Sequence, residues 1–284
     1  MEPALIAREE GETDRAQVDD ARVLREPIPL RQRILGDASP RIRLLQLLLL
    51  AALLATWEVV GRSSSSLAFA PPSAMVPAAR DMISSGELQS ALGDSLAALL
   101  LGYALAVTAG VAIGWTMGWW RTAGRVLDPF VAALYVVPVA AIVPLIIAWG
   151  GLGLGSRVTV VFLFCVFEIL LAANAGVRNI EGVYLDVART FGAGRADLMR
   201  KVVLPASLPF VMVGLRIGAS RALKGMVLAE ILFAVTGLGG LIVRYAGVFR
   251  MDKVLVVVVT ISLLGIVLSA SVVALERRVT RWRP

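Results

Sequence analysis

The stretch DVARTFGAGRADLMRKVVLP, residues 186–205, carries six charged side chains between long apolar segments. Two glycines at its middle predict a sharp break, because glycine adopts backbone conformations that are closed to other residues. We therefore expect a short helix that begins at 181 or 183 and ends at 191, followed by a second helix over 195–203. This pattern predicts a compact, charged structure rather than a solvated loop.

The predicted helix over 195–203 has an apolar stripe at helical spacing, and its charged residues occupy the rest of its surface. The stripe consists of Leu198, Met199, Val202 and Val203. A solvated loop needs no such stripe, so either the underside of the membrane domain or a partner protein must cover it, and the pattern favours neither. Pro205 and Pro209 predict that the helix ends or kinks where the next apolar segment begins, because proline lacks an amide donor.

The whole chain has the composition of a membrane protein. Its 284 residues are 58% hydrophobic, with a mean hydropathy of +0.79. A helix needs about 20 apolar residues to cross the hydrocarbon core of a bilayer. Six segments meet this requirement, and we expect an all-α membrane protein with six spans, the first of them uncleaved. The expected spans are 42–60, 95–119, 127–149, 158–177, 207–231 and 254–275.

The distribution of Lys and Arg predicts the orientation of the chain. The side that holds both termini and the connection 178–205 carries sixteen of these residues near span ends, and the other side carries six. Because cytoplasmic connections are enriched in Lys and Arg, we expect both termini and the 178–205 connection in the cytoplasm. The net charge of +7 follows from these flanking residues, so it does not indicate nucleic-acid binding. Residues 1–40 read as a disordered cytoplasmic tail, and 41–284 read as the membrane domain.

The sequence contains no group of residues that predicts catalysis. Histidine is absent, and the single cysteine, Cys165, lies in an apolar run where packing is its expected role. No phosphate-binding G-x-x-x-x-G-K-[ST] motif occurs, and the glycine-rich 150–156 reads as a turn between spans. The acids Glu58 and Glu168 are isolated in sequence. We therefore expect no enzyme activity, no cofactor and no metal.

Charged and helix-breaking residues within the expected spans are candidates for a transport pathway, because such residues usually face a cavity or one another. Internal ion pairing and packing against neighbouring spans are the alternatives for the charges, and packing or gating for the prolines. The candidates are Pro138 and Pro144 in the third span, and Arg216, Ser220, Arg221, Lys224 and Glu230 in the fifth.

The spacing within 186–205 resembles the cytoplasmic signature of ABC-importer permeases: E-A-A, three residues, Gly, nine residues, Ile, one residue, Leu-Pro. Here the positions are held by Asp186-Val187-Ala188, then Gly192, then Val202 to Pro205. Asp, Val and Val replace Glu, Ala and Ile. The likeness extends over 67–284, through FAPPSAMVPAARDMISSGELQSALGDSL, GRVLDPF, VPVAAIVPLIIAWGGLG, VLAEIL and GLGGLI, and it is to the nitrate/sulfonate/taurine/bicarbonate-type branch.

This resemblance implies a type I importer permease whose 178–205 loop docks on a separate ATPase. It also implies a second permease copy, an ATPase dimer, an extracytoplasmic binding protein and a small anionic solute such as a sulfonate or nitrate. The implied coupling residues are Asp186, Ala188, Gly192, Ala193, Leu198, Leu204 and Pro205. A self-contained secondary transporter or channel is the alternative function. An intramembrane enzyme is disfavoured, because paired catalytic groups are missing.

Overall fold

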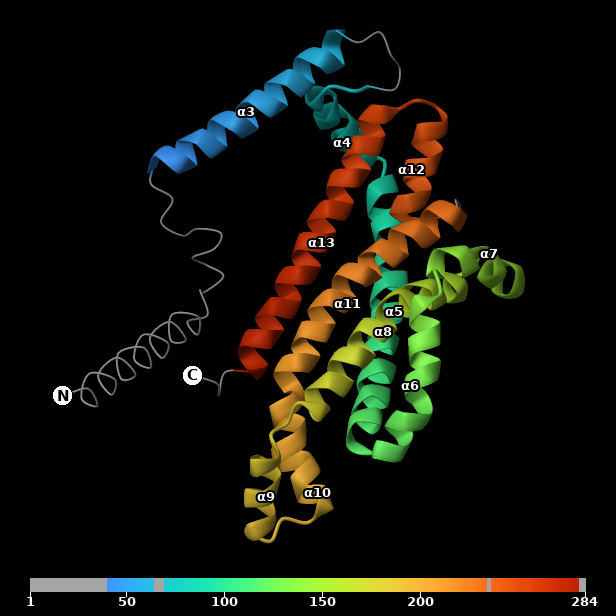
Figure 1. Ribbon diagram of the computed structural model, residues 1–284. Helices are drawn as coiled ribbons and strands as arrows, with labels where there is room; N and C mark the ends of the chain where they lie inside the picture. The colour runs from blue at the N-terminus through green and yellow to red at the C-terminus, as the bar shows by residue number, and fades with distance from the viewer. Residues whose placement is uncertain (1–39, 64–68, 234–235, 281–284) are drawn as a thin grey trace, which may run out of the picture. The chain divides into compact units, whose positions relative to one another are not determined.

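The computed structural model describes residues 40–63, 69–233 and 236–280 (Figure 1). Every regular element in these ranges is helical, which confirms the expected all-α fold class. The predicted tail lies outside the described residues except for Pro40, where the first helix begins. The longer helices are α3 (Pro40–Ser63), α5 (Glu87–Trp119), α6 (Arg121–Val136), α7 (Val139–Gly150), α8 (Leu154–Arg178), α11 (Leu204–Phe233) and α13 (Met251–Val279). The shorter elements are η1 (Pro72–Ala74), α4 (Met75–Ser84), α9 (Gly182–Thr190), α10 (Arg195–Asp197), the π-helical η2 (Leu198–Val203) and α12 (Gly237–Gly247).

The number of membrane spans depends on one broken helix pair. Among the described residues, five helices are long and apolar enough to cross a membrane, and a sixth span results if α6 and α7 count as one. These two helices meet at an angle of 92°. Pro138 precedes α7 at this break, as expected for a proline that interrupts a helix. The same expectation for Pro144 was wrong, since Pro144 lies inside α7 without breaking it.

The chain divides into two compact units, at Trp57 within α3. The first unit contributes an apolar helix, and the second unit begins at Glu58. Its core consists of α8 packed between α5 and α11. Leu99, Ile169 and Met226 are among its buried side chains.

Glycines allow these three helices to approach closely. On α5, a Cβ atom at Gly102 would lie 2.6 Å from Cβ of Val161 on α8, and one at Gly118 would lie 2.5 Å from Cβ of Val177. On α11, a Cβ at Gly218 would lie 2.8 Å from Cγ1 of Ile169. Small residues replace side-chain volume with direct backbone packing, which is the main source of attraction between helices in lipid. The core is thus built by glycines on both helices that contact α8.

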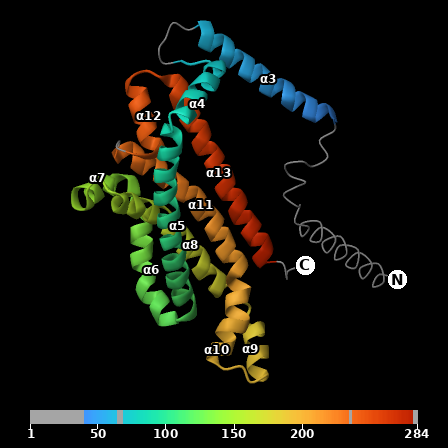
Figure 2. The ribbon, with the colours of Figure 1, turned by 180° about the vertical axis from the view of Figure 1, so that it is seen from behind.

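A second cluster of buried side chains closes one end of the unit, where α4, α12 and α13 meet. Met82, Leu238 and Val257 form its centre. The Lys253 ammonium lies 2.5 Å from the Asp81 carboxylate, and this hydrogen bond holds the pKa of Asp81 below its ordinary value. Figures 1 and 2 both show α9 and α10 at the opposite end of α11 from α12. The charged stretch and this cluster therefore lie at opposite ends of the second unit.

Candidate functional site

The charged stretch forms two antiparallel segments, α9 and α10–η2, which we call the α9–η2 hairpin (residues 182–203). Its turn depends on Gly192, whose φ of 79° is a left-handed conformation that favours glycine. The Gly192 amide donates to the Arg189 carbonyl at 2.9 Å, and the Ala193 amide donates to the Ala188 carbonyl at 3.1 Å. Helix α9 therefore ends in a closed turn, and the expected break lies where the glycines predicted it.

The apolar stripe expected on the second segment is covered within the chain. Leu198 and Val203 are buried, and η2 packs against α9. Met199 and Val202 are half-buried. Of the two alternatives for this stripe, the chain itself provides most of the cover. The stripe is therefore not the surface that the hairpin offers to a partner.

The apolar residues that the hairpin exposes lie on α9 and its turn instead. We call them the α9 apolar row: Val183, Tyr184, Val187 and Phe191. Phe191 is 87% exposed, an unusual position for a phenylalanine in a charged region. The spacing of 183, 187 and 191 places these residues on one helix face. Helical periodicity over 181–191 was the available signal for this row, whereas the stripe predicted from the sequence follows the glycines.

The remaining signature residues shape the hairpin. The Asp186 carboxylate is exposed and accepts a hydrogen bond from Arg189 at 2.8 Å, within its own helix. The helix was expected to end or kink at Pro205 and Pro209, and it does not end at either, since α10, η2 and α11 run without a break from Arg195 to Phe233. The Leu204 amide donates to the Met199 carbonyl, one residue further back than in an α-helix. This wide π turn shifts the hydrogen bonds just before the proline, so the helix continues without a break.

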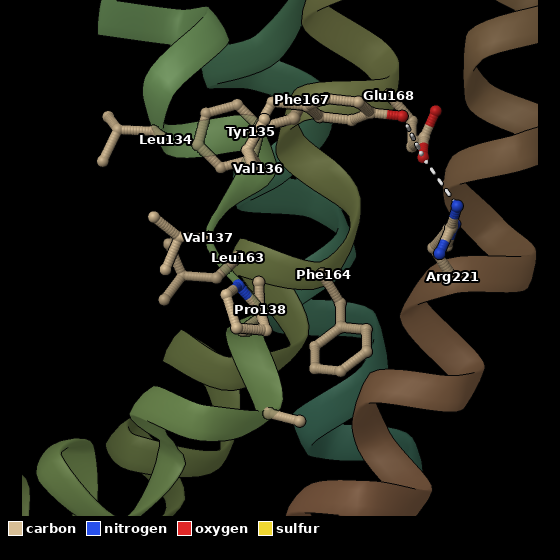
Figure 3. A pocket seen from close by; sticks show the side chains of 12 residues that line it. Leu134, Tyr135, Val136, Val137, Pro138, Leu163, Phe164, Phe167, Glu168 and Arg221 are labelled. Carbon is tan, nitrogen blue, oxygen red and sulfur yellow. Dashed lines mark hydrogen bonds and ion pairs between the residues drawn. The ribbon is translucent and has the colours of Figure 1, made fainter.

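A cavity of about 390 Å³ opens beside the break between α6 and α7 (Figure 3). It brings together two of the pathway candidates, Pro138 and Arg221. The Arg221 guanidinium lies 3.2 Å from the Glu168 carboxylate, and the Tyr135 hydroxyl donates to the same carboxylate at 3.4 Å. Phe167 packs edge-on against the Tyr135 ring. The cavity therefore combines one cation, one anion and aromatic walls.

Glu168 was isolated in sequence, and only the packing of α8 beside α11 pairs it with a cation. Its side chain is mostly buried, whereas Arg221 is half exposed. A carboxylate in the middle of an apolar span was the available signal, because such residues are costly unless they are paired.

Four other candidates do not line this cavity. Arg216 forms an ion pair with Glu276 on α13, which is the internal pairing considered as an alternative. Ser220 and Lys224 are exposed on α11, Lys224 beside a shallow apolar hollow. Pro144 is exposed on α7. For Ser220, Lys224 and Pro144, a role in the pathway stays a prediction.

Glu230 is the last candidate, and its side chain is fully buried. Ser95 on α5 donates to its carboxylate at 2.8 Å, and the Gly239 amide in the first turn of α12 donates at 2.9 Å. The Leu238 amide in turn donates to the Ser95 hydroxyl at 2.9 Å, and Arg157 on α8 lies 3.7 Å from the carboxylate. The N-terminus of a helix stabilises a negative charge. Glu230 thus ties four helices together.

Among the residues that the structure describes, no three or more His, Cys, Asp or Glu side chains lie close enough together to hold a metal ion. The functional features are therefore a hairpin with an exposed apolar row and a membrane cavity. One continuous helix, α10–η2–α11, connects them.

Comparison with known proteins gives the family. Residues 102–281 match the model of the family described as binding-protein-dependent transport system inner membrane component. The taurine transport system permease of Escherichia coli is 34% identical over 67% of this chain and 70% of its own length. A putative aliphatic sulfonates transport permease of Bacillus subtilis is 30% identical over 84% of this chain and 87% of its own length. The riboflavin transport system permease of Chloroflexus aurantiacus is 34% identical over 86% of this chain and 95% of its own length.

A solved structure shares the fold. It is the methionine ABC transporter MetNI in inward-facing conformations, with a TM-score of 0.60 over 67% of this chain and 94% of the other. At 17% sequence identity, this likeness concerns the fold alone. The matched family model covers both the hairpin and the cavity. The chain therefore belongs to the binding-protein-dependent transport system inner membrane components, as a multi-pass ABC-transporter permease of the bacterial inner membrane.

Proposed function

We propose that the chain forms the translocation pathway of an ATP-driven importer, and that a separate ATPase subunit docks on the α9 apolar row. The observation that carries this proposal is the exposure of four large apolar side chains on an otherwise charged hairpin. Exposed apolar residues grouped on one helix face mark an interaction surface. The chain has no phosphate-binding loop of its own, so ATP hydrolysis requires another subunit.

The continuous helix α10–η2–α11 supports mechanical coupling between this surface and the cavity. It runs from Arg195 in the hairpin past Arg221 in the cavity wall. At about 1.5 Å per residue, the two positions are roughly 39 Å apart along the helix. A rigid helix moves as a body, so displacement of the hairpin by a closing ATPase would move the cavity wall. The proposed movement alternates the access of the cavity between the two sides of the membrane.

A second permease copy and a binding protein complete the proposed importer. The family description names transport that depends on a binding protein. Val136 at the α6–α7 break and Trp149 near the end of α7 are each 79% exposed. A homodimer that packs this side of both copies together would enclose the two cavities between them. Cysteine pairs placed across the twofold axis would crosslink only if the two copies meet on this side.

The proposed solute is small and carries an anionic group, such as a sulfonate or nitrate. Arg221 supports it as the cation in the cavity, and the names of the taurine and sulfonate permeases point the same way. Glu168 neutralises much of this charge, so a solute that also carries a cation, as an amino-sulfonate does, would match both groups. A simple inorganic anion would match only Arg221.

Reconstitution tests the proposed importer against a secondary transporter. The chain would be placed in proteoliposomes with a candidate ATPase and a candidate binding protein, and uptake of taurine, nitrate and riboflavin would be measured. We expect uptake of a solute only with ATP and both partners present. Uptake by the chain alone, driven by an ion gradient, would overturn the proposal.

A further inference from the structure

A second cavity lies at the hairpin end of the unit, away from the pathway candidates. It measures about 680 Å³ and lies between the turn that joins α5 to α6 and the α9–η2 hairpin. We call it the arginine hollow, because Arg121, Arg189 and Arg195 line it from three different elements. Among the residues that the structure describes, no acid lines it. Neither the coupling surface nor the transport cavity accounts for three arginines here.

The charge of the arginine hollow is only partly compensated. Arg189 forms an ion pair with Asp186. Within the described part of the chain, Arg121 and Arg195 have no acidic partner closer than 4.0 Å. The first turn of α6, which begins at Arg121, contains no acid and has no side-chain cap, so its amides add partial positive charge. The hollow is therefore suited to an anion with several oxygen atoms.

The other walls of the arginine hollow are apolar and aromatic. Trp119 and Trp120 lie where the apolar helix α5 ends, and Ile180 and Leu185 also line the hollow. Tryptophan favours the interface between hydrocarbon and water, which places the hollow at the level of lipid headgroups. A free phosphate ion would use the arginines but leave these apolar walls in water. A phospholipid would use both.

We propose that the arginine hollow binds the phosphate of an anionic phospholipid, with the glycerol and upper acyl chains against the tryptophans. Basic pockets between membrane helices are suited to such headgroups. The lipid would contact both the α5–α6 turn and the hairpin, so it would link the membrane surface to the segment that carries the α9 apolar row.

Lipid binding and ATPase docking use different faces of α9. Leu185 and Arg189 face the hollow, and they are four residues apart. Val187 of the α9 apolar row lies two residues from both of these positions, and Val183 lies two residues before Leu185. At 100° per residue, a two-residue step places side chains on nearly opposite helix faces. The lipid site therefore stays available when a partner covers the row, and it does not depend on the proposed function.

Native mass spectrometry of the purified full chain tests this site. Phosphatidylglycerol, an anionic lipid, and phosphatidylcholine, a neutral one, would be titrated separately. We expect retained phosphatidylglycerol, and a fall in its affinity of about fivefold for each arginine removed, since one basic residue contributes about that much at an anionic surface. The test variant is Arg121→Gln/Arg195→Gln. Its matched control is Arg125→Gln/Arg200→Gln, which loses the same charge at exposed positions outside the hollow.

Two further measurements keep the result decisive. Equal melting temperatures of both double variants in phosphatidylcholine would show that the substitutions leave the fold intact. Inorganic phosphate as a competitor distinguishes the two sources of the phosphate group. Equal retention of phosphatidylglycerol by the test and control variants would overturn the proposal. Displacement of the lipid by inorganic phosphate would also overturn it, by assigning the hollow to a soluble anion.

Discussion

The guanidinium of Arg221 on α11 lies 3.2 Å from the carboxylate of Glu168 on α8, at the edge of the cavity beside the α6–α7 break (Figure 3). The two residues flank the α9–η2 hairpin in sequence, and only the pairing of their helices brings them together. Because α11 continues into the hairpin, we expect α11 to move when the hairpin moves. The ion pair links this helix to α8, its neighbour in the core.

Removing one member of this pair should affect stability and uptake differently. Arg221→Gln leaves Glu168 mostly buried without its cation, and we expect a loss of about 1–2 kcal/mol in stability, discounted for the exposure of Arg221. Uptake should fall about tenfold or more, because the cavity loses its cation. Thermal unfolding and proteoliposome uptake measure the two effects.

The double variant Glu168→Gln/Arg221→Gln is the control for this prediction. It removes both charges, so we expect most of the lost stability to return while uptake stays low. Recovery of uptake together with stability would show that the pair is structural only.

Placing a charge on the α9 apolar row should prevent ATPase docking. Phe191→Asp puts a carboxylate at the most exposed apolar side chain of the hairpin, and we expect ATPase affinity to fall at least about tenfold, as for an interface hot spot. Stability should change by less than about 0.5 kcal/mol, because the side chain makes few contacts within the chain. Co-purification of the ATPase measures the effect.

Ala196→Asp is the matched control, because Ala196 is exposed on the second segment of the hairpin and lies outside the row. We expect this variant to retain the ATPase. Loss of the ATPase from both variants would point to charge alone rather than to the row.

Alanine substitutions at Gly192 and Gly194 distinguish the effect of backbone strain from the effect of steric fit. Neither position has an atom within 4 Å of an added Cβ, but only Gly192 has a positive φ. Gly192→Ala should therefore cost about 1 kcal/mol, and Gly194→Ala, whose φ is −73°, should be neutral or slightly stabilising. Melting temperatures of the two variants measure the difference. Equal effects would show that the left-handed turn does not shape the hairpin.

The buried network around Glu230 should respond steeply to the loss of one hydroxyl. Ser95→Ala leaves the Leu238 amide without its acceptor and removes one donor to Glu230, so we expect a loss of about 1–3 kcal/mol. Ser90→Ala, at an exposed position earlier in the same helix, should stay within about 0.5 kcal/mol of the parent chain. A loss for Ser95→Ala no larger than for Ser90→Ala would mean that Glu230 is satisfied without the hydroxyl.

The sequence by itself determined the helical class, the membrane character and the place of the hairpin turn. These follow from local properties: long apolar runs cannot stay in water, and glycines at 192 and 194 permit a turn that other residues resist. The spacing within 186–205 also resembled the permease signature. The orientation of the chain rests on its Lys and Arg distribution and remains a prediction.

Proline was an inconsistent local signal for helix breaks. Pro138 lies at a sharp break, Pro144 lies inside a helix, and a π turn carries the chain past Pro205. A proline removes one hydrogen bond wherever it occurs, but neighbouring helices decide whether the helix then bends.

Only the tertiary structure decided the partner of each charge. Arg216 and Arg221 lie five residues apart, yet one pairs with α13 and the other with α8, and Glu230 is enclosed by four helices. Charges buried in a membrane must find partners, and those partners come from distant segments that are brought near by glycine-lined helix contacts. The exposed side of the hairpin was decided in the same way, because packing covered the stripe on η2 and left the row on α9 uncovered.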